Sequence, residues 1–99
     1  MVDSDEPPTP STPEQDMDVA TYYIHKGDYD AAVPRLQEAI QEKPTLARPR
    51  LMLAEVYEKK GDTRAAVQTY QDYLKALPNA PDAKKIEKKI EKLEEHQAS

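Results

Sequence analysis

The sequence predicts an all-α fold in which five helices form an antiparallel helix-turn-helix repeat array. The first observation is a repeat: GDYDAAV at residues 27–33 returns as GDTRAAV at residues 61–67. With the copies aligned at an offset of 34 residues, ten of the 34 positions are identical. The second is that apolar residues recur at helical spacing within each copy. At 99 residues the chain can supply one small domain and a tail.

The N-terminal segment, residues 1–15, has the composition of a disordered tail. It holds four acidic residues and four of the nine prolines, it has no Lys or Arg, and it offers almost nothing apolar to bury. We therefore expect the folded domain to cover residues 16–96. The alternative for the tail is a linker that holds the domain away from an anchoring surface.

The first repeat, at about residues 16–45, predicts two helices. The first helix, residues 16–26, carries its apolar residues on one arc. These residues are Met17, Val19, Ala20, Tyr23 and Ile24. Gly27 can adopt the left-handed conformation with which many helices end, and Asp28 can cap the helix that follows.

The second helix of this repeat is expected to run to about Glu42. Pro44 ends it, because a proline disfavours helical dihedral angles in the residue before it. Ala31 and Ala32 remove bulk near its start and let the paired helices approach closely. Pro34, inside the same helix, cannot donate a backbone hydrogen bond, so we expect a late start or a kink.

The second repeat, at about residues 47–79, uses the same signals. Gly61 and Asp62 separate its two helices, and Pro78 ends the second of them near Ala76.

The last segment, at about residues 80–96, predicts a fifth helix with two distinct faces. The apolar face is formed by Ala83, Ile86, Ile90 and Leu93. A separate arc carries Lys84, Lys85, Lys88, Lys89 and Lys92. The apolar face is expected to dock on the second repeat, whose packing surface would otherwise be exposed.

A helix-turn-helix unit of this length and pattern resembles the tetratricopeptide repeat. The positions that carry the resemblance are Ala20 and Ala54, Tyr23 and Tyr57, Ala32 and Ala66, Leu36 and Tyr70, and Pro44 and Pro78. The chain departs from the family's pattern at Asp16 and Arg50, where an aromatic is usual, and at Tyr73, where a small residue is usual. The resemblance implies an α-solenoid of two repeats closed by a capping helix.

The resemblance also implies a function, because such arrays bind extended peptides or helices along the concave face of their first helices. Carried over residue by residue, that groove is formed by Met17, Thr21, Ile24, His25, Arg48, Leu51, Glu55 and Lys59. The alternative is that Met17, Ile24 and Leu51 only pack one helix on the next. The family's two-carboxylate clamp needs Lys and Asn at groove positions that hold Met17, Thr21 and Glu55 here, so we do not expect that clamp.

The lysine arc of the last helix is a second candidate surface, for an acidic protein partner. The alternative is a solvated helix face with opposite charges one turn apart, as at Lys84 and Glu87 or Lys88 and Glu91. The acidic tail is a further candidate for covering this face.

Composition excludes several classes of function. A net charge of -5 argues against nucleic acid as a partner, and the absence of Cys excludes thiolate chemistry and Cys-ligated zinc. His25 and His96 have no companion ligands or nucleophile, and no Gly-rich phosphate loop is present. We expect no enzymatic activity and no cofactor. The predicted function is a non-catalytic module that binds a protein or peptide.

The sequence is less informative about compartment and assembly. No apolar run is long enough to insert into a membrane, so we expect a cytoplasmic protein. The first repeat is also similar to those of bacterial envelope lipoproteins of the outer-membrane assembly type, which would place the domain in the periplasm or envelope if it is part of such a protein. The alternative function is then a structural or assembly subunit that self-associates through the N-terminal edge near Tyr22.

Overall fold

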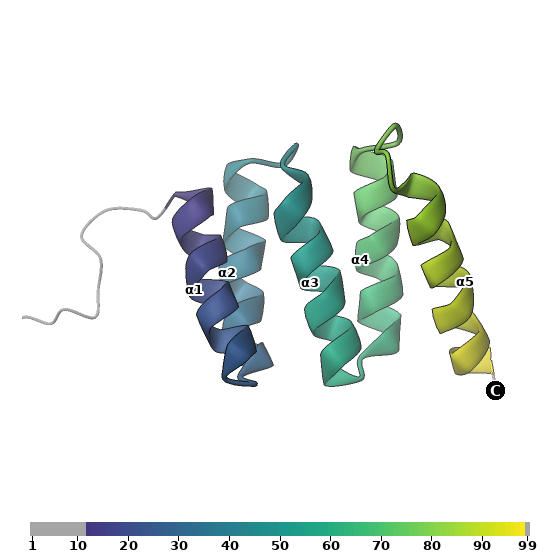
Figure 1. Cartoon of the computed structure of the whole chain (residues 1–99), viewed down its shortest axis with the longest axis horizontal. Helices are drawn as coiled ribbons and strands as arrows, with labels where there is room; N and C mark the ends of the chain where they lie inside the picture. Colours follow the sequence, from purple (N-terminus) through teal and green to yellow (C-terminus); the bar gives the residue numbers. More distant parts are fainter. Residues whose placement is uncertain (1–11, 99) are drawn as a thin grey trace, which may run out of the picture.

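The computed structural model describes residues 12–98, and within them the chain forms a row of five helices with no strand (Figure 1). The helices are α1 (Pro13–His25), α2 (Tyr29–Glu42), α3 (Ala47–Lys60), α4 (Thr63–Ala76) and α5 (Ala83–Ala98). Each helix packs against the next along the chain. Helices α1, α3 and α5 form the nearer layer in Figure 1, and α2 and α4 lie behind them. The all-α repeat array predicted from the sequence is confirmed.

The helix boundaries within each repeat follow the predicted signals. Gly27 and Gly61 both adopt a left-handed conformation, with φ of 79° and 82°. Asp28 and Asp62 then cap α2 and α4, because their carboxylates accept hydrogen bonds from backbone N–H groups three residues later, at 3.3 and 3.2 Å. The helices end at Glu42 and Ala76, as the two terminating prolines predict.

Three local predictions are corrected. Helix α1 begins at Pro13 rather than at residue 16, because Thr12 and Gln15 form a reciprocal capping box around its first turn. The predicted tail therefore loses residues 13–15 to the helix, while residues 1–11 lie outside the described part of the chain. Helix α5 begins at Ala83 rather than at residue 80, because Pro81 lies in a turn that precedes it.

The third correction concerns the late start expected from Pro34, which does not delay α2, while the kink stays a prediction. The helix begins at Tyr29, five residues before this proline. Asp28 caps its first turn, and the missing N–H of Pro34 removes a single hydrogen bond from the ladder.

The apolar side chains form two cores that share α3. The first core lies between α1, α2 and α3, and its buried members are Ala20, Ala32, Leu36, Leu53 and Val56. The second lies between α3, α4 and α5, and its buried members are Ala54, Val67, Tyr70, Tyr73, Ile86 and Ile90. The three alanines among these residues are fully buried, which lets the helices approach closely. Burial of Ile86 and Ile90 shows that the apolar face of α5 docks on the second repeat.

Asp16 takes an unusual place for a carboxylate, since its side chain is completely buried. Its Oδ1 lies 3.4 Å from the Arg35 guanidinium on α2, and its Oδ2 has no hydrogen-bond partner among the described residues. The position at which the repeat pattern usually has an aromatic thus carries a buried carboxylate, which pairs with a partly exposed guanidinium on the other helix of the first repeat.

Candidate functional site

The predicted groove residues all lie on α1 and α3, and the structure divides them by burial. Met17 and Ile24 pack against the first core, and Leu51 packs against the second. The Thr21 hydroxyl donates to the Met17 carbonyl at 2.8 Å, within α1. The remaining members are exposed, and they are His25, Arg48, Glu55 and Lys59. The apolar groove residues therefore contribute to packing between helices, and their contact with a partner stays a prediction.

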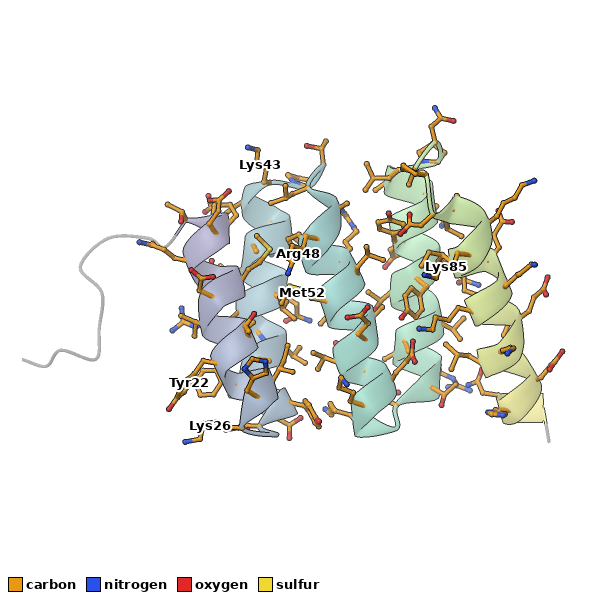
Figure 2. The ribbon with its side chains drawn as sticks, viewed as in Figure 1. Tyr22, Lys26, Lys43, Arg48, Met52 and Lys85 are labelled. Carbon is orange, nitrogen blue, oxygen red and sulfur yellow. The ribbon has the colours of Figure 1, made fainter. Side chains whose placement is uncertain are left out.

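Part of this groove continues into a hollow between α3 and α5, with α4 behind it. We call it the α3–α5 hollow, and its volume is about 400 Å³. Its lining residues are Leu51, Glu55, Tyr70, Asp82, Lys85, Ile86, Lys88, Lys89 and Lys92. Figure 2 shows Lys85 on the side of α5 that faces α3 and α4. The structure thus joins two predicted groove residues, Leu51 and Glu55, to four of the five lysines of the second candidate surface.

The hollow has an apolar side formed by three elements. Leu51 of α3 is half-buried there, while Ile86 of α5 is 6% exposed and Tyr70 of α4 is 1% exposed. These side chains are already held by the second core, so a ligand would meet a preformed surface.

Tyr70 links the three helices that surround the hollow. Its hydroxyl donates to Glu58 Oε2 of α3 at 2.5 Å, and Lys89 Nζ of α5 lies 3.5 Å from the same oxygen. The Lys89 ammonium is also 5.8 Å from the centroid of the Tyr70 ring, in a cation–π arrangement. Burial, and next the hydrogen bond to Glu58, raise the pKa of Tyr70 above its ordinary value. The contacts with Glu58 and the Tyr70 ring therefore hold the Lys89 side chain in place beside the hollow.

A second tyrosine fixes the start of α5. The buried Tyr73 hydroxyl donates to Asp82 Oδ1 at 2.7 Å, and Asp82 directly precedes α5. Burial, and next this hydrogen bond, raise the pKa of Tyr73 to about 12. Asp82, one of the two acidic residues that line the hollow, thus already has a hydrogen-bond partner within the domain.

The comparison with known families gives a match that begins within α1 and ends within α5. Residues 23–90 match the tetratricopeptide repeat family, a span of more than half of the chain that includes every lining residue of the hollow except Lys92. The chain belongs to the tetratricopeptide repeat family. No curated protein matches it. Tetratricopeptide repeats are typically non-catalytic modules for protein–protein interaction, and this chain has the corresponding helical repeat architecture.

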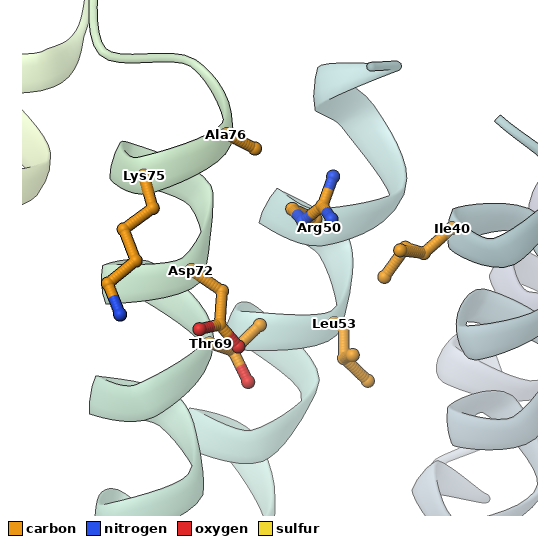
Figure 3. Close-up of a pocket in the computed structure, with 7 residues that line it drawn as sticks. All are labelled: Ile40, Arg50, Leu53, Thr69, Asp72, Lys75 and Ala76. Carbon is orange, nitrogen blue, oxygen red and sulfur yellow. The ribbon is translucent and has the colours of Figure 1, made fainter. Parts of the chain in front are cut away.

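Further hollows lie elsewhere among residues 12–98 of the tetratricopeptide repeat domain. One, of about 400 Å³, lies between α2, α3 and α4 and is shown in Figure 3. Its lining residues are Ile40, Arg50, Leu53, Thr69, Asp72, Lys75 and Ala76. Another includes Lys59 and lies beside the ion pair between Lys60 and Asp30, which joins the end of α3 to the start of α2. The Asp30 carboxylate raises the pKa of Lys60 through their hydrogen bond.

The structure does not bring all of the predicted site residues together. The four from α1, together with Arg48, Lys59 and Lys84, do not line the α3–α5 hollow. Sequence reasoning also missed Glu58, Tyr70 and Asp82 as parts of the site. In the sequence, Tyr70 stands out only as a position that carries the repeat resemblance, and no local signal places a residue of α4 behind α3 and α5.

Two further observations concern metal sites and membrane spans. Within residues 12–98, no three His, Asp or Glu side chains lie close enough together to hold a metal ion. In the same part of the chain, no helix has the length and apolarity that crossing a membrane requires.

Proposed function

We propose that this tetratricopeptide repeat domain binds a peptide or helix of a partner protein on the face formed by α1, α3 and α5. The observation that carries the proposal is the α3–α5 hollow, which combines a preformed apolar side with charged residues around it. An apolar side chain of the partner would sit against Leu51 and Ile86. Polar groups of the partner would meet Glu55 and the lysines of α5.

The test is site-directed photo-crosslinking in the source cells. A photo-reactive residue replaces Glu55, which is exposed and lines the hollow, or Gln41, which is exposed on α2 and serves as the control position. We expect a partner protein to crosslink from position 55 and not from position 41. Adding Leu51→Glu should abolish that crosslink, because it places a charge against the apolar side of the hollow.

The control for folding is essential, since Leu51 also packs against the second core. Circular dichroism and the melting temperature of the Leu51→Glu variant must show a folded domain, and Leu51→Ser gives a second variant without an added charge. Equal crosslinking from positions 55 and 41, or crosslinking that survives both Leu51 variants, would contradict the proposed site.

A second candidate function is self-association of the domain as a subunit of a larger assembly. The Tyr22 residue is 57% exposed to solvent, and it is the one large apolar residue that is exposed among the described residues. It lies on the outer side of α1, where its ring contacts the Tyr23 ring and the Lys26 ammonium (Figure 2). In the crosslinking experiment, adducts between two copies of this chain that are lost on Tyr22→Ser would favour this function.

A further inference from the structure

The charges around the α3–α5 hollow differ in sign from the molecule as a whole. The chain has a net charge of -5, yet four lysines and only two acidic residues line the hollow. One of those acids, Asp82, accepts a hydrogen bond from Tyr73. A local excess of positive charge on an acidic protein attracts a ligand of negative charge and disfavours cationic ones.

The lysines of the hollow are not equivalent. Lys89 is held by Glu58 and the Tyr70 ring. Lys85, Lys88 and Lys92 have no ion pair within 4.0 Å among residues 12–98, although acidic residues lie one turn away along α5. Three ammonium groups are therefore available to carboxylates from outside.

The spacing of these three lysines defines the ligand further. They stand at i, i+3 and i+7 on α5, so they share one face and span about 10 Å along the axis at a rise of about 1.5 Å per residue. Leu51 and Ile86 lie beside that row. A complementary ligand carries one apolar side chain for this apolar side and carboxylates spread over one to two helical turns.

We infer that the partner segment bound at the α3–α5 hollow is an acidic one with an apolar side chain, whose carboxylates pair with Lys85, Lys88 and Lys92. This inference rests on the proposed function and names the chemistry of its partner. Repulsion from these lysines excludes basic segments, so the hollow selects partners by charge as well as by apolar fit.

The experiment selects peptides from a displayed library of random twelve-residue sequences, with the full-length protein as bait. We expect the enriched peptides to carry net negative charge and at least one large apolar residue, relative to the unselected library. Lys88→Glu/Lys92→Glu should weaken binding of an enriched peptide about tenfold or more. The control is Lys84→Glu, which reverses one lysine charge on α5 outside the hollow, half the charge change of the double variant, and should leave affinity within about twofold.

The outcomes separate the inference from the proposed function. Enriched peptides that depend on Leu51 but have no acidic excess would overturn the charge selectivity and leave the proposed function standing. If no peptide depends on Leu51, both fail. A further variant tests whether the chain's own N-terminal acidic residues compete with the peptide for the hollow. It is the full chain with Asp3→Asn/Asp5→Asn/Glu6→Gln. A tenfold gain in peptide affinity would identify the chain's own N-terminal acids as the occupant and overturn the assignment to a partner.

Discussion

At the scale of single residues, the least expected feature is the pairing of buried polar groups with partners on a neighbouring helix or in the turn before it. Asp16 meets Arg35, Tyr70 meets Glu58, and Tyr73 meets Asp82. A buried hydroxyl without a partner destabilises a fold by about 1–3 kcal/mol, and a buried charged group by more, so each pair favours one arrangement of the two elements that it joins. These pairs make the packing specific where apolar contact alone would not.

The Tyr73 pair predicts how stability depends on pH. Its folded pKa of about 12 lies above the unfolded value of about 10. As pH rises past 10 the unfolded chain loses this proton first. The stability that the pair provides, fully present below pH 10, is therefore lost between about pH 10 and 12. We expect the free energy of unfolding, measured by urea titration, to fall over this range, and Tyr73→Phe to reduce the fall.

Tyr22→Phe is the matched control, because it removes an exposed phenol on the outer side of α1. At neutral pH, Tyr73→Phe should also cost about 0.5–1.5 kcal/mol through the lost hydrogen bond. An equal change of the pH profile in both variants would show that Tyr73 has no special part in it.

At the scale of the elements, the helices begin and end where short-range chemistry requires. Thr12, Asp28 and Asp62 each supply a side-chain acceptor to a first turn. Gly27 and Gly61 supply the left-handed residue between paired helices. These signals act over a few residues, which is why those at residues 27–28 and 61–62 could be located in the sequence without knowledge of the packing.

The two aspartate caps give a prediction at this scale. Asp28→Ala and Asp62→Ala should each lower the free energy of unfolding by about 0.5–2 kcal/mol, because each leaves a first-turn N–H without its acceptor. Asp28→Asn and Asp62→Asn keep an acceptor and should retain most of the stability. Urea unfolding followed by circular dichroism measures both sets. The exposed Asp18 of α1 gives a control, and a loss for Asp18→Ala as large as for the caps would argue against capping.

At the scale of the whole molecule, α3 connects the two halves. It contributes Leu53 and Val56 to the first core, and Ala54 with the half-buried Leu51 to the second. The ion pair between Lys60 and Asp30 adds a contact between the repeats. A helix that belongs to both cores transmits a change in one to the other, as nearest-neighbour coupling does in repeat proteins.

We therefore expect a cavity in the first core to loosen the second. Leu36→Ala should destabilise the domain by about 2–5 kcal/mol. Hydrogen exchange monitored by NMR should then show reduced protection in α4 and α5 as well as in α1 and α2. Leu36→Val provides a smaller cavity and keeps the test available if the alanine variant does not fold. Unchanged protection in α4 and α5 would mean that the two repeats open independently.

The sequence by itself determined the five helices, the repeat and the apolar face of α5, because each depends on signals within one or two turns of chain. It did not predict the capping box at Thr12, because the composition of residues 1–15 indicates a tail. It also did not predict that α5 begins only after Pro81. Only the tertiary structure decided that Lys85, Lys88 and Lys92 stand beside Leu51 and Glu55, and that Tyr70 lies behind them. That juxtaposition depends on how α5 packs across α3 and α4, which is set by contacts between side chains far apart in the sequence.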